Sequence, residues 1–320
     1  MQNDAHARLE RRLDRAFCVA IATATWLFGL VSAVQGAMAA SSTPSDTLVA
    51  AIQKDRADTE TWLRTSPTSY LAAVSRVDFD NRRELTVGSA AGNDVKLEDS
   101  TVSAHHLRVT VVGDSFQVAA VDPAARFLVG ETSMSEATLP PRSIGVGRYL
   151  IRLSHQRFPA LIAFDPKSPR FAEYKGLQYY PVDLHYRFVL PLTTNPRPDT
   201  IIILSTRGNS RRAVRAGWFD FTVGGKRCRL EATRLLEPGV GENDMGIFFR
   251  DATTGKETYG VGRYIDPEKQ PDGRYVIDFN RAYNPACAFS DYYNCPIPPK
   301  ANALKVAIQA GEKDPHYLAH

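Results

Sequence analysis

The segment GWFDFTVGGKRCRLEA, residues 217–232, is the part of the sequence that most directly indicates a fold. Apolar side chains alternate with polar ones from Phe219 to Val223, and again from Cys228 to Leu230, on either side of Gly224-Gly225. Alternation with a period of two is typical of strands that bury one face. A Gly-Gly pair suits a type I′ turn because both of its central residues need a positive φ. The segment therefore predicts a two-residue hairpin whose aromatic residues face the core.

Further strand patterns extend from this hairpin along the chain. Apolar residues alternate in GDSFQVAAVD (113–122) and in DLHYRFVLPL (183–192), and TIIILST (200–206) is a short apolar run typical of a buried strand. The 21 Gly and 20 Pro residues separate many short segments, whereas one segment alone has a helical pattern. We therefore expect a mainly β fold, a β-sandwich or barrel of antiparallel strands with one N-terminal helix.

Changes of composition divide the chain into units. Residues 40–65 predict a polar tether followed by an amphipathic helix, because apolar residues recur there at helical spacing between charged ones. The segment FDPKSPRF, residues 164–171, interrupts the strand patterns with two Pro and a Ser. It separates a first β unit, 66–165, from a second β unit, 172–317.

Residues 1–39 have the three parts of a secretory signal peptide. A polar segment with four Arg, residues 1–15, precedes an uncharged apolar run, residues 16–34, and Ala37 and Ala39 supply the small residues of a cleavage site. The alternative is a retained membrane anchor, because the run is long enough to span a bilayer. We expect cleavage, which predicts a periplasmic or secreted protein with no stable membrane span.

The charge pattern and the motif content exclude several classes of function. The formal net charge is +4, and the basic residues are scattered along the sequence. Because nucleic-acid-binding proteins cluster their basic residues on one face, we expect no nucleic-acid partner. The sequence contains no Rossmann fingerprint, nucleophile elbow or His-Glu-x-x-His motif, and we expect no cofactor. An active site assembled from distant residues stays possible on these grounds.

Three cysteines follow the signal segment. Cys287 and Cys295 are close together in a loop rich in Pro and Tyr, and we expect them to form a disulfide in an oxidising compartment. Cys228 alternates with apolar residues in the predicted hairpin, which indicates a buried and unreactive thiol. A metal site is the alternative for the pair, but the sequence has no Cys-x-x-Cys and the nearest His is His316. We therefore predict no metal.

The first β unit contains ELTVGSAAGNDVKLEDSTVSAHHLRV, within residues 84–110. This segment resembles the opening of a forkhead-associated domain, with Ser103 and His106 at the places of that family's phosphopeptide-facing Ser and structural His. The family carries an Arg after the Gly of its turn, whereas Ser89 follows Gly88 here. Because that Arg would supply a bidentate phosphate donor, the resemblance implies a β-sandwich without phosphopeptide binding.

The second β unit contains a series of closely spaced motifs. They are Asp251-x-x-Thr-Gly, Thr258-Tyr-Gly-x-Gly-Arg-Tyr, Asp278-Phe-Asn-Arg-Ala-Tyr-Asn-Pro, Cys295-Pro-x-Pro-Pro and Ala310-Gly-Glu-Lys. In these motifs the chain resembles the domain-of-unknown-function family 1684, and the resemblance extends over its C-terminal two thirds. It implies a common fold and a shared site, and it implies nothing about a substrate.

Charged, amide and aromatic side chains recur in these motifs between Gly and Pro residues. The candidate ligand-binding residues are Tyr259, Arg263, Asp278, Asn280, Tyr283, Asn284 and Glu312. In one interpretation they line a pocket, where we expect Arg263 to pair with Asp278 or Glu312. In the other interpretation, the Asn and Asp side chains cap backbone donors and fix the loop to the unit.

The leading hypothesis is an exported β-rich module of the cell envelope that binds an unknown small-molecule or polymeric ligand. One alternative is a hydrolase-like enzyme with Asp278 or Glu312 as the acid or base and Arg263 as an anion clamp. The other alternative is a purely structural envelope protein. A pocket that holds these groups and raises a carboxyl pKa would favour the enzyme, whereas a loop with satisfied hydrogen bonds would favour a scaffold.

Overall fold

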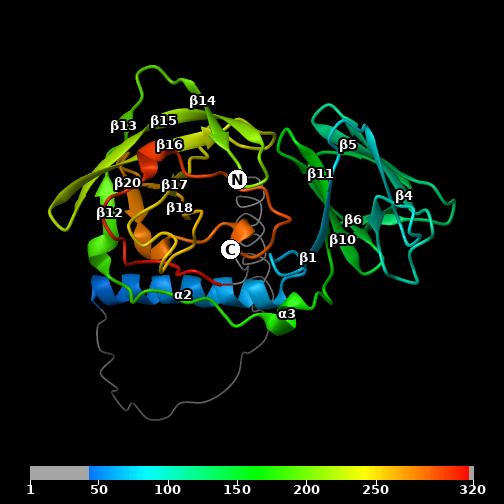
Figure 1. Cartoon of the computed structure of the whole chain (residues 1–320), viewed down its shortest axis with the longest axis horizontal. Coiled ribbons are helices and arrows are strands. Elements are labelled where there is room, and N and C mark those ends of the chain that lie inside the picture. Colours follow the sequence, from blue (N-terminus) through cyan, green and yellow to red (C-terminus); the bar gives the residue numbers. More distant parts are fainter. Residues whose placement is uncertain (1–42, 317–320) are drawn as a thin grey trace, which may run out of the picture.

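A computed structural model describes residues 43–316 of the chain. The predicted signal peptide, residues 1–39, lies outside these residues. Within the described range, no helix combines the length and the apolar character that crossing a bilayer requires. Figure 1 shows two groups of strands side by side, with the helix α2 (Pro44–Thr65) running along one of them.

The first β unit consists of two sheets that share one core. The six-stranded sheet has the order β1 (Ala73–Asp78), β11 (Pro159–Phe164), β10 (Tyr149–His155), β9 (Arg142–Val146), β6 (Phe127–Val129) and β7 (Thr132–Met134). The five-stranded sheet has the order β3 (Val95–Lys96), β2 (Glu84–Gly88), β4 (Leu107–Val112), β5 (Ser115–Ala120) and β8 (Glu136–Leu139). Buried side chains of both sheets, such as Leu85, Phe116 and Leu153, pack into this core. The unit is therefore a β-sandwich.

The second β unit contains three smaller sheets. The first consists of β12 (Arg187–Leu190), β20 (Tyr275–Asp278) and β19 (Glu268–Lys269), in this order. The second has the order β13 (Thr193–Thr194), β15 (Ser210–Val223) and β14 (Thr200–Leu204), and β16 (Lys226–Leu235) also pairs with β15. The third is the pair β17 (Ile247–Phe249) and β18 (Arg263–Ile265). Apart from the parallel pair β2 and β3, the paired strands are antiparallel. The predicted mainly β, antiparallel fold is confirmed, and no sheet within residues 43–316 closes into a barrel.

The hairpin predicted at Gly224 and Gly225 is formed by β15 and β16. Val223 pairs with Lys226 across the two glycines, whose φ angles are 54° and 75°. Both Phe residues of β15 are buried. The prediction is confirmed because the turn type and the alternation of side chains are properties of the local sequence.

The helix α2 is the one long helix among the described residues. It begins with a capping box in which Thr43 and Asp46 bond to each other's backbone N–H. Arg56 donates from the middle of the helix to the carbonyls of Tyr180 and Asn280, at 2.9 and 3.3 Å. These bonds fix the helix to the second unit, along which it runs in Figure 1. The shorter helices are α3 (Arg170–Glu173) and the 3-10 turns η1 (Leu184–Tyr186), η2 (Phe279–Arg281), η3 (Ala286–Ala288) and η4 (Lys300–Asn302).

The two β units meet through a common cluster of buried side chains. Ile162 and Phe164 of β11 belong to the same cluster as Phe248, Tyr264 and Phe289 of the second unit. A separate core within the second unit lies under the β15–β16 hairpin. The contact between the two β units is therefore built from buried core side chains.

Candidate functional site

A hollow of about 640 Å³ opens on the second unit beside its contact with the first. Its lining residues come from the turn after β14, the turn before β18, and η3 with the loop that follows it. They are Thr206, Arg207, Tyr259, Val261, Cys287, Asp291, Tyr293 and Ile297. Pockets that bind small molecules are of this size and combine apolar walls with a few polar groups.

The inner wall of the hollow is formed by Tyr259 and Cys287. The Tyr259 hydroxyl donates to the carbonyl of Cys287 at 3.1 Å and lies 3.7 Å from its Sγ. Burial, followed by the neighbouring thiol of Cys287, raises the pKa of Tyr259. The hydroxyl therefore keeps its proton at any physiological pH and acts as a donor.

Behind this wall lies Cys295, which is fixed by its neighbours. The N–H of Cys287 donates to Cys295 Sγ at 3.2 Å. Thr206 bonds to Cys295 twice: its N–H donates to the Cys295 carbonyl at 2.9 Å, and its hydroxyl accepts from the Cys295 N–H at 3.1 Å. The disulfide predicted between the two cysteines is not formed in the structure, and both side chains are buried. Cys228 is also buried and outside a disulfide, and burial raises its pKa.

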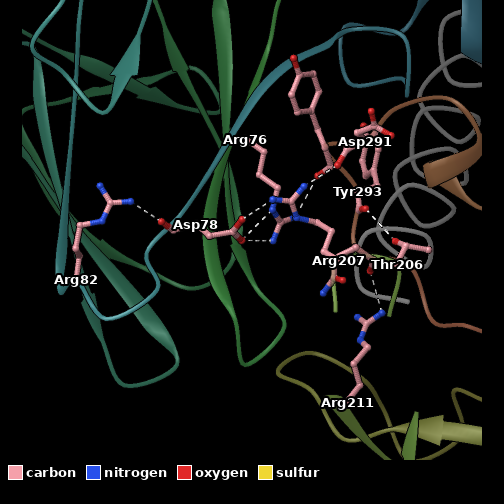
Figure 2. Close-up of polar contacts among 10 residues, drawn as sticks. Arg76, Asp78, Arg82, Thr206, Arg207, Arg211, Asp291 and Tyr293 are labelled. Atoms are coloured by element: carbon pink, nitrogen blue, oxygen red, sulfur yellow. Dashed lines mark hydrogen bonds and ion pairs between the residues drawn. The ribbon is translucent and has the colours of Figure 1, made fainter. Parts of the chain in front are cut away.

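Two side chains of opposite charge stand at the rim. Arg207 donates to the carbonyl of Asp291 at 2.8 Å and to the carboxylate of Asp78 at 3.0 Å, as Figure 2 shows. The carboxylate of Asp291 is exposed, and within residues 43–316 it has no hydrogen bond or ion pair. At the rim, the Arg207 guanidinium therefore makes hydrogen bonds within the protein, whereas the Asp291 carboxylate faces solvent.

The loop that carries Asp291 is held through its carbonyl groups. Four arginines and one threonine donate to carbonyls between residues 289 and 294. The pairs are Arg170 with Phe289 at 3.0 Å, Arg207 with Asp291 at 2.8 Å, Arg76 with Tyr292 at 3.2 Å, Thr206 with Tyr293 at 3.4 Å, and Arg211 with Asn294 at 3.1 Å. Arg76 belongs to β1 of the first unit, whereas the other four donors lie after residue 165, where that unit ends. Side chains of both units therefore position the loop.

Asp78 neutralises the two arginines at this junction. Its carboxylate accepts from Arg76, whose side chain is fully buried, at 2.7 Å and from Arg207 at 3.0 Å. Figure 2 shows the guanidinium groups of Arg76 and Arg207 next to each other beside Asp78. Burial opposes the ionisation of Asp78, but the hydrogen bonds and charges of the two arginines outweigh it and lower the pKa of this carboxyl.

Arg263, a predicted site residue, lies in the core and not at the hollow. One of its terminal nitrogens donates to Asp251 at 2.7 Å and to the carbonyl of Ile308 at 2.8 Å. The other donates to the carbonyls of Ala310 and Glu312. The predicted pairing with Asp278 or Glu312 carboxylates is wrong: the β17–β18 ladder pairs Phe249 with Arg263 and so brings Asp251 beside it.

Asp278 and Asn280 form a separate buried group at the end of β20. Asp278 accepts from the backbone N–H and the side-chain amide of Asn280, both at 3.0 Å. Asn280 also exchanges two bonds with the backbone of Asp183, at 2.9 and 2.8 Å. Burial raises the pKa of Asp278, although the Asn280 bonds and the charges of Arg187 and Arg56 act in the opposite direction. The group fixes the end of the strand to the segment before η1.

The other predicted site residues also bond to the protein itself. Asn284 donates from its N–H to Glu312 Oε2 and from its amide to the carbonyl of Lys313, both at 2.7 Å. The Tyr283 hydroxyl donates to Asp266 at 3.3 Å. Of the seven candidates, Tyr259 is the one that lines the hollow described here. The remaining six hold loops of the second unit together, as in the scaffold interpretation.

Sequence reasoning missed Thr206, Arg207 and Asp291. Thr206 and Arg207 follow an apolar strand and match no motif. Asp291 lies between Cys287 and Cys295, the predicted disulfide pair. It is an acidic residue in a loop rich in apolar and aromatic residues, and this contrast was a usable signal.

The first unit keeps the structural part of the forkhead-associated pattern. His106 accepts at Nδ1 from the N–H of Ser103 at 3.1 Å, and its Nε2 lies 2.8 Å from the carbonyl of Arg126. Ser89, which stands where the family has its Arg, turns its hydroxyl to the carbonyl of Val102 at 2.9 Å. The His therefore joins the loop before β4 to the loop before β6, and the position after Gly88 offers no cation to a phosphate.

Comparison with known proteins identifies the second unit. The family described as "Protein of unknown function (DUF1684)" matches residues 172–313. An uncharacterized protein of Haloarcula marismortui, solved by solution NMR, is 32% identical over 44% of this chain and 78% of its own, with a TM-score of 0.37. The chain belongs to the DUF1684 family. All seven candidate residues, and every residue that lines the hollow, lie in the DUF1684 segment.

Two further solved structures are similar to part of the chain. The forkhead-associated domain of FhaA, in complex with the intracellular domain of another protein, is 18% identical over 25% of this chain and 78% of its own, with a TM-score of 0.19. Mycobacterium tuberculosis EmbR, in complex with a low-affinity phosphopeptide, is 16% identical over 38% of this chain and 30% of its own, with a TM-score of 0.21. No curated protein is significantly similar to the chain in sequence.

Proposed function

We propose that the protein is an exported module that binds a small polar molecule in the hollow beside Arg207 and Asp291. The observation that carries this proposal is the exposed carboxylate of Asp291, which no described residue neutralises, at the rim of a hollow of about 640 Å³. A pocket of this size with a charged rim and an apolar inner wall fits a molecule that has a polar end and a less polar body.

The charges at the rim narrow the class of ligand. Asp291 attracts a cation, and Arg207 has donors left over because a guanidinium carries five N–H groups and two of its nitrogens make the described contacts. A ligand with an ammonium and a carboxylate satisfies both groups at once. We therefore propose a zwitterionic ligand, such as an amino acid or a short peptide, with the ammonium at Asp291 and the carboxylate towards Arg207.

A binding measurement on the mature chain tests this proposal. L-Methionine is a suitable probe, and its neutral counterpart, N-acetyl-methionine amide, is the matched control compound. By titration calorimetry we expect L-methionine to bind and the neutral compound to bind at least about tenfold more weakly. The variant Asp291→Asn should lose a similar factor, whereas Asp272→Asn, on an exposed turn that is not part of the hollow lining, should bind as the unchanged protein does. Equal binding of the two compounds, or full binding by Asp291→Asn, would refute the proposal.

Export and the disulfide belong to the same proposal. The sequence of residues 1–39 supports cleavage and release into the periplasm or the medium. In such an oxidising compartment we propose that Cys287 and Cys295 join in a disulfide, because Cys287 N and Cys295 Sγ lie 3.2 Å apart and the two residues are therefore neighbours in space. The intact mass of the exported chain tests both points: residues 1–39 should be missing and two hydrogens should be lost.

One observation favours the hydrolase alternative. Burial raises the pKa of Asp278, as a general acid requires. The anion clamp of that hypothesis is not available, however, because the donors of Arg263 are occupied by Asp251 and three carbonyls. The binding module is therefore our preferred function, and a purely structural role predicts no binding in the calorimetric test.

A further inference from the structure

We infer that the hollow is a thiol–disulfide exchange site, in which Cys287 reacts with a small zwitterionic disulfide and Cys295 completes the exchange. This inference rests on the proposed function, because it assigns a substrate class to the same hollow. It goes further in giving the site a reaction.

The two cysteines occupy different positions with respect to the hollow. Cys287 is part of the lining, so it is the cysteine that a molecule in the hollow meets first. Cys295 is not part of the lining and lies behind Cys287, where the Cys287 N–H holds its sulfur at 3.2 Å. Exchange through a mixed disulfide needs an accessible sulfur that is attacked or attacks first and a second sulfur within reach of it. The arrangement assigns the first role to Cys287 and the second to Cys295.

The surroundings of Cys287 suit a bound disulfide. The Tyr259 hydroxyl lies 3.7 Å from Cys287 Sγ and keeps its proton, so it is a hydrogen-bond donor beside the reacting sulfur. The hollow gives the incoming molecule room, since about 640 Å³ accommodates a molecule of amino-acid size attached to Cys287. The charged groups of such a molecule face the rim, where Asp291 and Arg207 stand.

The reaction balances with the bound disulfide as the oxidant. The Cys287 thiolate attacks one sulfur of the disulfide R–S–S–R, which forms a bond between Cys287 and one R–S group and releases the other as R–S⁻. The Cys295 thiolate then attacks Cys287 Sγ, forms the Cys287–Cys295 bond and releases the second R–S⁻. The two protons lost by the protein thiols go to the two released thiolates. The protein loses two electrons, and the small disulfide gains them.

Cys228 provides an internal comparison. It lies on β16 and is not part of the lining of the hollow, so a disulfide bound there does not reach it. Burial also raises its pKa, which lowers the fraction of the reactive thiolate. The inference therefore predicts reaction at two of the three described cysteines.

Mass spectrometry of the reduced, desalted mature chain tests the inference with L-cystine as the probe. The unchanged protein and Cys228→Ser should each become two hydrogens lighter and release two molecules of cysteine. Cys295→Ser should instead stop at one bound cysteine, which peptide mapping should place on Cys287. Cys287→Ser should acquire no cysteine. Circular dichroism identifies any variant that fails to fold. If a variant does not fold, the unchanged chain is alkylated in its native state before and after exposure to L-cystine. We then expect L-cystine to protect Cys287 and Cys295 from alkylation.

Two outcomes would overturn the inference, and neither coincides with failure of the proposed function. If Cys287→Ser reacts as fast as the unchanged chain, or if Cys295→Ser retains no adduct, the site does not carry out exchange, even when L-methionine binds. The neutral bis(2-hydroxyethyl) disulfide tests the assigned substrate class. We expect it to react about tenfold more slowly than L-cystine, and equal rates would refute a zwitterionic substrate.

Discussion

Asp78 and Arg207 are 129 residues apart in the sequence, and their side chains meet at 3.0 Å to join the two β units beside the hollow. Arg207 belongs to the turn after β14, and the same guanidinium donates to the carbonyl of Asp291. One side chain therefore couples the β-sandwich to the loop that carries the proposed ligand-binding carboxylate. Asp78 also neutralises the fully buried Arg76.

The first prediction concerns this coupling. Asp78→Asn leaves the buried guanidinium of Arg76 without a carboxylate, and because uncompensated buried charges are costly we expect a loss of about 2–3 kcal/mol in unfolding free energy. Urea unfolding measures it. Asp80→Asn makes the same change of charge two residues away, on an exposed side chain without a described ion pair, and should alter stability by less than about 0.5 kcal/mol. Equal effects of the two substitutions would show that the junction is not held by charge.

The second prediction separates two glycines of one family motif. Gly262 has a φ of 118°, and a Cβ there would meet the Phe249 carbonyl at 2.5 Å, whereas a Cβ on Gly260 would meet nothing within 4 Å. Gly262→Ala should therefore lower the unfolding free energy by about 2 kcal/mol or more, and Gly260→Ala should leave it nearly unchanged. Thermal unfolding followed by circular dichroism decides this, and a tolerated Gly262→Ala would contradict the described turn.

The third prediction tests the core ion pair of the DUF1684 segment. Asp251→Asn removes the carboxylate partner of Arg263, and both side chains are almost completely buried. We expect a loss of about 3 kcal/mol in unfolding free energy, because a buried guanidinium is left uncompensated. The exposed pair of Asp272 and Arg274 is the matched comparison. Asp272→Asn should cost less than about 1 kcal/mol, and a result in the same range for Asp251→Asn would count against a structural role for Arg263.

The fourth prediction uses the raised pKa of Asp278. The unfolded chain releases this proton at a lower pH than the native protein does, so ionisation favours the unfolded state. The contribution of Asp278 to stability therefore falls as the pH rises from about 4 towards neutrality. Asp278→Asn removes the titration and keeps an oxygen acceptor for Asn280. The difference in unfolding free energy between variant and unchanged protein should shift in favour of the variant over this interval, and parallel pH profiles would show that burial does not perturb the group.

Local features of the sequence were sufficient to predict much of the fold. The β15–β16 hairpin, the class of the fold and the N-terminal helix follow from alternation, turn residues and helical spacing. The pairing of β12 with β20, which sets Arg187 opposite Asp278, was not predictable in the same way. It joins segments 91 residues apart, and such pairing depends on the tertiary packing of whole sheets.

The sequence motifs predicted which polar residues of the second unit are important, but not which residues they bond to. The polar residues of the motifs are buried together, yet Arg263 bonds to Asp251 because of the β17–β18 register, which the motif spacing did not reveal. The hollow is lined by residues from three separate segments. Arg207 and Asp291 belong to no common pattern, and only the folded chain brings them to one rim.

The arginine contacts along residues 289–294 divide control of the hollow between the two β units. Residues 172–313 contain every residue that lines the hollow, but Arg76, Asp78 and Arg170 lie outside that segment. A gene that encoded the segment alone would inherit every lining residue and lose two of the four guanidinium anchors of the Asp291 loop, together with the carboxylate that orients a third. The β-sandwich therefore contributes no residue to the lining of the hollow and still fixes the loop that forms its rim, so that a substitution in either unit can change the shape of the cavity.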